Sequence, residues 1–275
     1  INRRFGVPDC VVPGENALAV LGLLIAEELY PGNGYSEGAQ AAAGYLLKVQ
    51  DSDGAWFNQY HRAVPGDISG SDESLSKSPY QTALVVLALY RMGFDRARYA
   101  AVKKAALYLM SCQAHGGNGL LLGSGKDQDG TYTSFRWASD NSIAYQALKA
   151  AETWAVMSGE LSHALYYSRA ARRVVEGVDS ILYISDRNDA DYGVWHRVVD
   201  ACDVPVDTSF HDWINYSPQL FDLPALGVNS AAAGEWIYGT LCDPSGACVI
   251  DDVNNRYMLS PVSSFKASLC WIDTQ

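Results

Sequence analysis

Two stretches of the chain end in the same way. Residues 45–56 read YLLKVQDSDGAW, and residues 108–119 read YLMSCQAHGGNG. In each stretch an apolar helical run ends at a glutamine, Gln50 or Gln113, and a glycine follows four residues later. A glutamine side chain can satisfy peptide groups exposed at a helix end, and glycine allows a tight exit from the helix. The two glutamines are 63 residues apart, which predicts a repeated unit of helices.

Helical patterns dominate the chain outside these stretches as well. One expected helix begins at Ser78, with Ser78 as N-cap, Pro79 in the first helical position and Gln81 completing a capping box. It is apolar on every face and ends near Gly93, so it must be buried on all sides. The next expected helix, over residues 96–112, shows a polar face. The sequence predicts further helices over residues 17–30, 36–50, 140–157, 161–182, 210–223, 230–241 and 261–270.

An inner helix that is buried all round, beside a more amphipathic partner, is the pairing that an α/α toroid requires. We therefore predict an all-α fold, a single α/α-toroid domain over residues 1–275, built as a barrel of helical hairpins. Short β-hairpins or loops are expected as insertions near residues 186–197 and 249–257. Only about ten helices or fewer can be counted, so an incomplete ring of hairpins is an alternative to a closed one. An open toroid would favour binding over catalysis.

The segment from Gln50 to Trp56 resembles the repeat of squalene–hopene-type terpenoid cyclases, in which Gln, Gly and Trp occur at this spacing. The second copy has Gly119 in the position of the tryptophan. The resemblance covers about residues 36–120 and implies an α/α toroid, the fold that these cyclases share with protein prenyltransferases. The Asp-x-Asp-Asp acid motif that class II cyclases use is absent, which disfavours cyclase chemistry.

Prenyltransferases hold zinc through Asp-x-Cys and a distant histidine. Asp200-Ala201-Cys202 fits the first part, but His211 lies only nine residues beyond Cys202, so we expect no metal and no cofactor. The second half is instead similar in pattern to six-hairpin glycosidases. Residues 137–145 and residues 207–213 each place an acid, a tryptophan and a helix start together. In such barrels the helix N-termini surround a central cleft.

The candidate catalytic residues are the acids of these two segments. Asp140 follows Trp137 and Asp212 precedes Trp213, each at the start of an expected inner helix. Glycoside hydrolysis needs two facing carboxylates, one of them kept protonated, and a neighbouring indole raises the pKa of a carboxyl group by desolvation. His211 could serve as a base or hold Asp212. Aspartate at a helix start also serves as a simple cap, which is the structural alternative.

The candidate substrate-binding residues are aromatic side chains and histidines on loops or at helix ends. Aromatic faces stack on sugar rings, and a neighbouring tyrosine and histidine are the pair that a polysaccharide lyase uses to move a proton. The set comprises Trp56, Tyr60, His61, Trp137, Tyr192, Trp195, His196 and Trp213.

The charge balance narrows the kinds of partner. The chain has 275 residues, with 31 acidic against 20 basic residues and a net charge of −11. That charge disfavours nucleic acid and strongly polyanionic glycans, so a neutral glycan or another small-molecule substrate fits best. No run of 18 or more apolar residues occurs, so no contact with a membrane is expected.

Cysteine usage suggests an oxidising compartment. The six cysteines are at positions 10, 112, 202, 242, 248 and 270, and Cys242 and Cys248 bracket a turn-rich segment. A disulfide between these two would close a small loop, as secreted proteins commonly do. A start at Ile1 without methionine and the sequon at Asn215 agree with this, so we expect a secreted protein.

We therefore expect a secreted carbohydrate-active enzyme that cleaves a glycan in the central cleft of the toroid. The negative net charge favours a hydrolase over a lyase, because lyases act on uronates. The alternatives are an enzyme of the terpenoid cyclase or prenyltransferase type acting on an isoprenoid, or a toroid that only binds a glycan or a protein.

Overall fold

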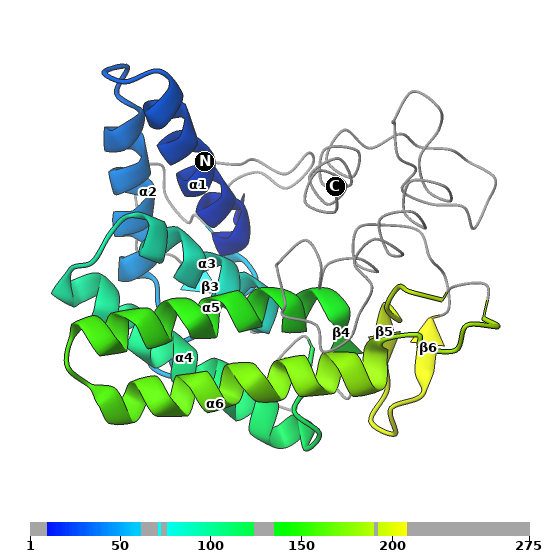
Figure 1. Cartoon of the computed structure of the whole chain (residues 1–275). Helices are drawn as coiled ribbons and strands as arrows, with labels where there is room; N and C mark the ends of the chain where they lie inside the picture. Colours follow the sequence, from blue (N-terminus) through cyan, green and yellow to red (C-terminus); the bar gives the residue numbers. More distant parts are fainter. Residues whose placement is uncertain (1–9, 62–70, 73–75, 124–134, 190–191, 208–275) are drawn as a thin grey trace, which may run out of the picture.

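The computed structural model describes residues 10–61, 71–72, 76–123, 135–189 and 192–207. Within these residues, six α-helices form three hairpins (Figure 1). The hairpins are α1 (Pro13–Leu29) with α2 (Tyr35–Lys48), α3 (Pro79–Arg91) with α4 (Arg96–Gly116), and α5 (Ala138–Met157) with α6 (Leu161–Gly177). A π-helical turn, Val178–Leu182, extends α6. The expected helices over residues 210–223, 230–241 and 261–270, and the insertion near 249–257, lie outside the described residues.

The six helices form two layers. Helix α3 packs against both α1 and α5, and each of these three also packs against its own hairpin partner. Contacts among α2, α4 and α6 are much sparser, so α1, α3 and α5 form the inner layer. The rings of Tyr90 and Trp154 are in contact, which places the C-terminal ends of α3 and α5 side by side. The two-layer arc confirms the predicted all-α class and the pairing of inner and outer helices.

Two small antiparallel sheets lie where the inner helices begin. The first has the order β1 (Cys10–Val11), β2 (Tyr60–His61) and β3 (Ser71–Asp72). The second has the order β4 (Arg136–Trp137), β5 (Val198–Val199) and β6 (Pro205–Asp207). Strand β4 runs directly into α5, and β5 and β6 come from the chain after α6. Within the insertion expected near residues 186–197, an antiparallel β-bridge joins Trp195 to Tyr183, and Ile184 exchanges backbone hydrogen bonds with Gly193 and Val194.

The start of α3 confirms one expected cap and corrects another. The Ser78 Oγ accepts a hydrogen bond from the Tyr80 amide at 3.1 Å, as an N-cap should. Gln81 does not complete a capping box. Its Oε1 instead accepts from the Gly14 amide in the first turn of α1 at 3.1 Å, and its Nε2 donates to the Asn58 carbonyl at 3.1 Å. The prediction failed because a neighbouring helix supplies an orphan amide that competes for this side chain.

The two predicted glutamines make equivalent contacts. The Gln50 Nε2 donates to the carbonyls of Gly54, at 2.8 Å, and Ala101, at 2.9 Å. The Gln113 Nε2 donates to the carbonyls of Gly119, at 2.7 Å, and Ala170, at 2.9 Å. Each glutamine therefore fixes its own exit loop and also ties its outer helix to the next outer helix: α2 to α4, and α4 to α6.

The glycines of the two loops correct the alignment of the repeat. Gly54 has φ +95° and Gly119 has φ +94°, a region that side chains disfavour. A Cβ on Gly54 would lie 2.3 Å from the Lys104 carbonyl oxygen, and one on Gly119 would lie 2.4 Å from that of Arg173. Gly119 is thus the equivalent of Gly54 and does not stand in the tryptophan position. Counting on from these glycines, Leu121 takes the place of Trp56.

Candidate active site

The first turn of α5 holds an unusual run of buried polar side chains. Ser139, Asp140, Asn141 and Ser142 are at most 7% exposed, in a helix whose other buried residues are mainly alanine, leucine, isoleucine and tryptophan. Burying polar groups is costly unless they are hydrogen-bonded. The Asn141 side chain meets this need by accepting from the Leu121 amide at 2.7 Å and donating to the Trp137 carbonyl at 2.8 Å. The turn is thereby fixed to the strand-like segment that leaves α4.

Asp140 is the buried carboxylate of this turn. It is 7% exposed, and among the described residues no other acidic side chain is buried to this degree. Its carboxylate accepts a hydrogen bond from the Ser139 Oγ at 3.2 Å, and no described cation forms an ion pair with it. Burial raises the pKa of Asp140 to about 7, against the smaller lowering effect of the Ser139 hydrogen bond. Asp140 is therefore divided between its acid and its ionised forms near neutral pH.

The buried thiol of Cys112, on α4, lies within electrostatic range of this carboxylate. Burial raises the pKa of Cys112 to about 12, and the charges of Asp53 and Asp140 add to that effect. The thiol is consequently neutral at every pH at which the protein would be assayed. Cys112 therefore adds no charge to the surroundings of Asp140.

Trp137 is held on two sides. The Arg197 guanidinium carbon lies 5.5 Å from the centroid of the indole, and the Arg197 carbonyl accepts from the Ala138 amide at 3.0 Å. A Cβ on Gly123 would lie 2.5 Å from the indole Cδ1, so the backbone of Gly123 lies against the ring edge. Trp137 is half-buried beside the first turn of α5. Arg197 thus covers part of the ring that we expected to receive a sugar.

Several predicted substrate-binding residues turn out to be structural. Trp56 is 0% exposed, and its Nε1 donates to the Leu46 carbonyl at 2.8 Å. Trp195 is 1% exposed. Tyr60 is 4% exposed, and its hydroxyl donates to the Val49 carbonyl at 2.5 Å and accepts from the Phe57 amide at 3.2 Å. We interpret these three side chains as structural, because packing against the core leaves no ring face for a ligand.

The remaining predicted residues are distributed differently. Tyr192 and His196 are half-buried on the segment between α6 and β5. His61 contributes its backbone to β2, and its side chain lies outside the described set. Asp212, His211 and Trp213 also lie outside the described residues, as do Cys242 and Cys248. Cys202 is an exposed free thiol and Cys112 a buried one. The structure adds Ser139, Asn141, Gly123 and Arg197. Ser139 and Asn141 flank the predicted Asp140 and Arg197 follows the predicted His196, whereas Gly123 carried no signal in the sequence.

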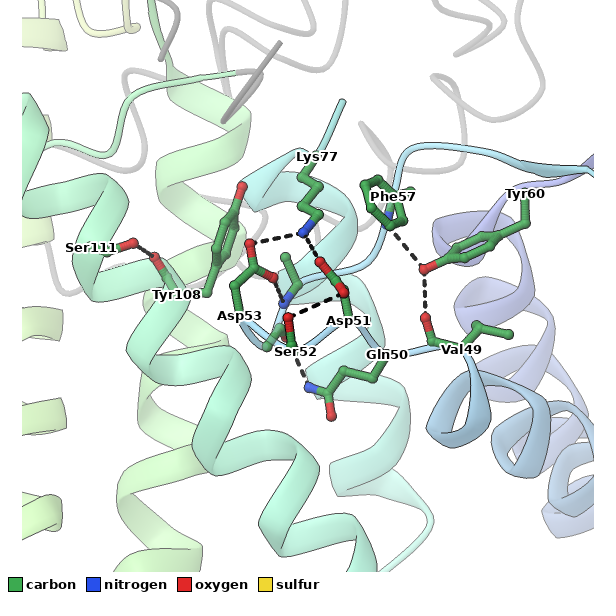
Figure 2. Close-up of polar contacts among 12 residues, drawn as sticks. Val49, Gln50, Asp51, Ser52, Asp53, Phe57, Tyr60, Lys77, Tyr108 and Ser111 are labelled. Carbon is green, nitrogen blue, oxygen red and sulfur yellow. Dashed lines mark hydrogen bonds and ion pairs between the residues drawn. The ribbon is translucent and has the colours of Figure 1, made fainter. Parts of the chain in front are cut away.

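A second buried charge lies before α3. Figure 2 shows the Lys77 ammonium between Asp51 and Asp53, with the Asp53 carboxylate at 2.8 Å, and Lys77 lies 4.4 Å from the centroid of the Phe57 ring. Burial opposes ionisation of Asp51, but the hydrogen bond and charge of Lys77, with a further bond from Ser52, lower its pKa below the ordinary value. Every charge in this group has a partner, so we interpret it as structural.

The part of the chain that the structure describes contains neither a cluster of metal ligands nor a membrane-spanning helix. No group of three or more His, Cys, Asp and Glu side chains there is arranged to hold a metal ion. No helix there is long and apolar enough to cross a bilayer.

Known proteins resemble this chain in structure. No protein-family model and no curated sequence matches it. A GH76 α-mannanase from Bacteroides thetaiotaomicron superposes with a TM-score of 0.68 at 15% identity, over 98% of this chain and 70% of that one. A GH63 mannosylglycerate hydrolase from Thermus thermophilus gives 0.64 at 13% identity, over 98% and 81%. A D-mannose isomerase gives 0.54 at 12% identity, over 99% and 90%.

The fold is that of the six-hairpin α/α-toroid glycosidases. At these sequence identities the similarity establishes architecture, and the chemistry has to be argued from the site. The names of these three proteins describe enzymes that act on carbohydrates or sugar derivatives. The resemblance to terpenoid cyclases stays a prediction.

Proposed function

We propose that this chain is a glycoside hydrolase in which Asp140 is the general acid. The observation that carries the proposal is that Asp140 is 7% exposed and has a pKa raised to about 7. A glycosidase must protonate the leaving oxygen with a carboxyl group that stays protonated near neutral pH, and burial is the usual means of achieving this. The position of Asp140 at the start of an inner helix supports the same role.

The second carboxylate is proposed to be Asp212, with His211 beside it. Hydrolysis with retention needs the two carboxyl groups about 5–5.5 Å apart, and hydrolysis with inversion about 6.5–9.5 Å apart. The stereochemistry of the first product therefore reports the separation between Asp140 and its partner.

The substrate is proposed to be a neutral, mannose-containing glycan. The net charge of −11 disfavours polyanionic chains. The α-mannanase and the mannosylglycerate hydrolase share this fold, and their names describe enzymes that act on mannose-containing compounds. Export from the cell, where such polymers occur, stays part of this proposal.

The alternatives have less support. A lyase that used Tyr60 and His61 would need a free phenol, but the Tyr60 hydroxyl already has two backbone partners. An isoprenoid enzyme would line its cavity with aromatic rings, whereas the start of α5 is polar. A binding-only toroid has no use for a buried carboxyl group at the pKa of a general acid.

The test compares the wild-type chain with Asp140→Asn on α-mannan and on mannosylglycerate, measuring release of reducing sugar and of mannose. We expect wild-type kcat to fall as pH rises through about 7, because Asp140 loses its proton there. Asp140→Asn should lose at least about 100-fold in kcat, the usual scale of general acid catalysis.

Folding supplies the control for this variant. The folded-state pKa of Asp140 is raised, so its ionisation destabilises the fold as pH rises above the ordinary carboxyl value. Asp140→Asn should therefore unfold at the same or a higher temperature than wild type at pH 8. Glu37→Gln, an exposed change on α2 of the same kind, should leave activity intact. Full turnover by Asp140→Asn, or conversion of D-mannose without any hydrolysis, would sink the proposal.

A further inference from the structure

A buried cation stands immediately before each of two inner helices. Lys77 precedes the cap of α3, and Arg136 precedes the first residues of α5. Their side chains are 7% and 6% exposed. A buried cation must be paired with an acid, since leaving it unpaired is costly. The two hairpins supply that acid in different ways.

In the α3 case the acid comes from the exit loop of the preceding outer helix. Asp53 pairs with Lys77, and its other oxygen accepts from the Ala55 amide at 3.0 Å. The equivalent residue in the next hairpin is Asn118, whose Oδ1 accepts from the Leu120 amide at 3.2 Å in the same manner. An amide carries no charge, so this loop cannot neutralise Arg136.

The acid for Arg136 comes from Asp203, in the turn between β5 and β6. The Arg136 Nη1 lies 2.8 Å from the Asp203 Oδ1 and 2.6 Å from the Asp200 carbonyl oxygen. The Asn118 amide also donates to the Asp203 carboxylate. Asp203 has φ +63°, and no other non-glycine residue in the described part of the chain has a positive φ. Aspartate tolerates this left-handed conformation better than most side chains do.

This turn is continuous with the segment that covers the start of α5. Val198 and Val199 of β5 pair with Trp137 and Arg136 of β4. Immediately before them, the Arg197 carbonyl binds the Ala138 amide, and its guanidinium lies over the Trp137 indole. A contact that holds the β5–β6 turn in place therefore also holds Arg197 beside the first turn of α5.

We propose that Asp203 is a positioning residue that holds the β5–β6 turn, through Arg136 and Asn118, against the N-terminal end of α5. The role rests on the proposed function of Asp140. Asp53 pairs with the buried cation in one repeat; Asn118 takes its place in the next, where the buried cation pairs with Asp203 of an inserted turn far along the chain. Asp203 thereby keeps Arg197 on Trp137 and limits the access of water to the first turn of α5.

The test uses Asp203→Gly, since glycine accepts φ +63° and removes only the carboxylate. We expect faster hydrogen exchange at residues 196–206 and in the first turn of α5, and a Tm lower by about 2–6 °C. We also expect kcat/KM on α-mannan to fall about 10- to 100-fold. The pH at which kcat declines should move below 7, because a wetter Asp140 has a lower pKa. Cys112, the described titratable group that interacts electrostatically with Asp140, is unchanged in this variant.

Two double variants separate this positioning role from simple charge neutralisation. Asn118→Asp with Asp203→Gly gives Arg136 a new acid but does not hold the β5–β6 turn. In this variant Tm should recover, whereas hydrogen exchange, kcat/KM and the pH at which kcat declines should stay as in Asp203→Gly. Asn118→Asp with Asp203→Asn exchanges the two groups and should restore all four. Asp186→Asn, an exposed acid of the same insertion, is the control and should change none.

Recovery of exchange and kcat/KM along with Tm in the first double variant would overturn the proposal, as would wild-type exchange in Asp203→Gly. Failure of the proposed function appears elsewhere, as full activity of Asp140→Asn. The exchange readout needs no substrate, so the two results stay distinguishable.

Discussion

Replacing Gly119 by alanine tests how closely the α4–α5 loop approaches α6. The Cβ would lie 2.4 Å from the Arg173 carbonyl oxygen, at least about 1 Å inside ordinary contact. Gly117, two residues earlier, has φ +80°, but a Cβ there would meet nothing within 4 Å. The two positions share the left-handed backbone and differ in the close approach, so they form a matched pair.

The magnitudes follow from these distances. Alanine in the left-handed region costs about 1–2 kcal/mol, which is the whole expectation for Gly117→Ala. In Gly119→Ala the loop must also move away from α6. This stretches the Gln113 hydrogen bonds to Gly119, at 2.7 Å, and to Ala170, at 2.9 Å. Weakening two bonds of a side chain that is 2% exposed adds about 2–3 kcal/mol, giving a total of about 3–5 kcal/mol.

Urea unfolding followed by circular dichroism measures both free energies of unfolding. The midpoint of Gly119→Ala should lie well below that of Gly117→Ala, with similar slopes. Free energies of unfolding within about 1 kcal/mol of each other would refute the reasoning, and a larger loss in Gly117→Ala would reinstate Gly117 as the equivalent of Gly54.

Three further predictions concern other side chains. Lys77→Met leaves Asp51 and Asp53 without their cation and should cost about 2 kcal/mol at pH 7. Because the folded-state pKa of Asp51 is lowered, its contribution to stability is present above the ordinary carboxyl pKa and is lost as pH falls; the difference between variant and wild type should shrink towards pH 2. Gln81→Ala removes the acceptor for the Gly14 amide and should cost about 1–2 kcal/mol, whereas Gln40→Ala on the exposed face of α2 should cost under about 0.5 kcal/mol; equal losses would contradict the inter-helix cap. Cys112→Ala should not change the number of thiols that an alkylating reagent labels in the native protein at pH 8, because burial raises the pKa of Cys112 to about 12, but should lower that number by one in urea; a native difference would show that the thiol is accessible.

The helices could be predicted because their signals are local. Ser78 and Pro79 mark the start of α3, and the apolar pattern that follows gives its burial. Helix α1 begins at Pro13, four residues before the expected start, because proline suits a first helical position even without a side-chain cap. The repeat was found from Gln50 and Gln113, but its glycines were misaligned. Two extra residues precede Gly119, and only the contact with α6 shows which glycine is equivalent.

The candidate site could be predicted only in part. A position beside Trp137 at a helix start was enough to select Asp140, and burial then explains its pKa. Sequence alone could not show that Trp56 and Trp195 face the core, because a loop tryptophan gives no periodic signal. The contacts of Asp203 with Arg136 and Asn118 could not be predicted from the sequence either. Asp203 is 67 residues from Arg136 and 85 from Asn118, and nothing local to any of the three predicts the others.

The two glutamines that link successive outer helices affect which amino-acid exchanges the neighbouring helix can tolerate. Each donates to main-chain carbonyls, of Ala101 or of Ala170, so the neighbouring helix is recognised through atoms that every amino acid possesses. Its surface residues can be exchanged without loss of the joint, provided that the helix stays in place. The joint therefore depends on the two glutamine side chains and on the position of the neighbouring backbone, and not on the side chains of the helix that is bound.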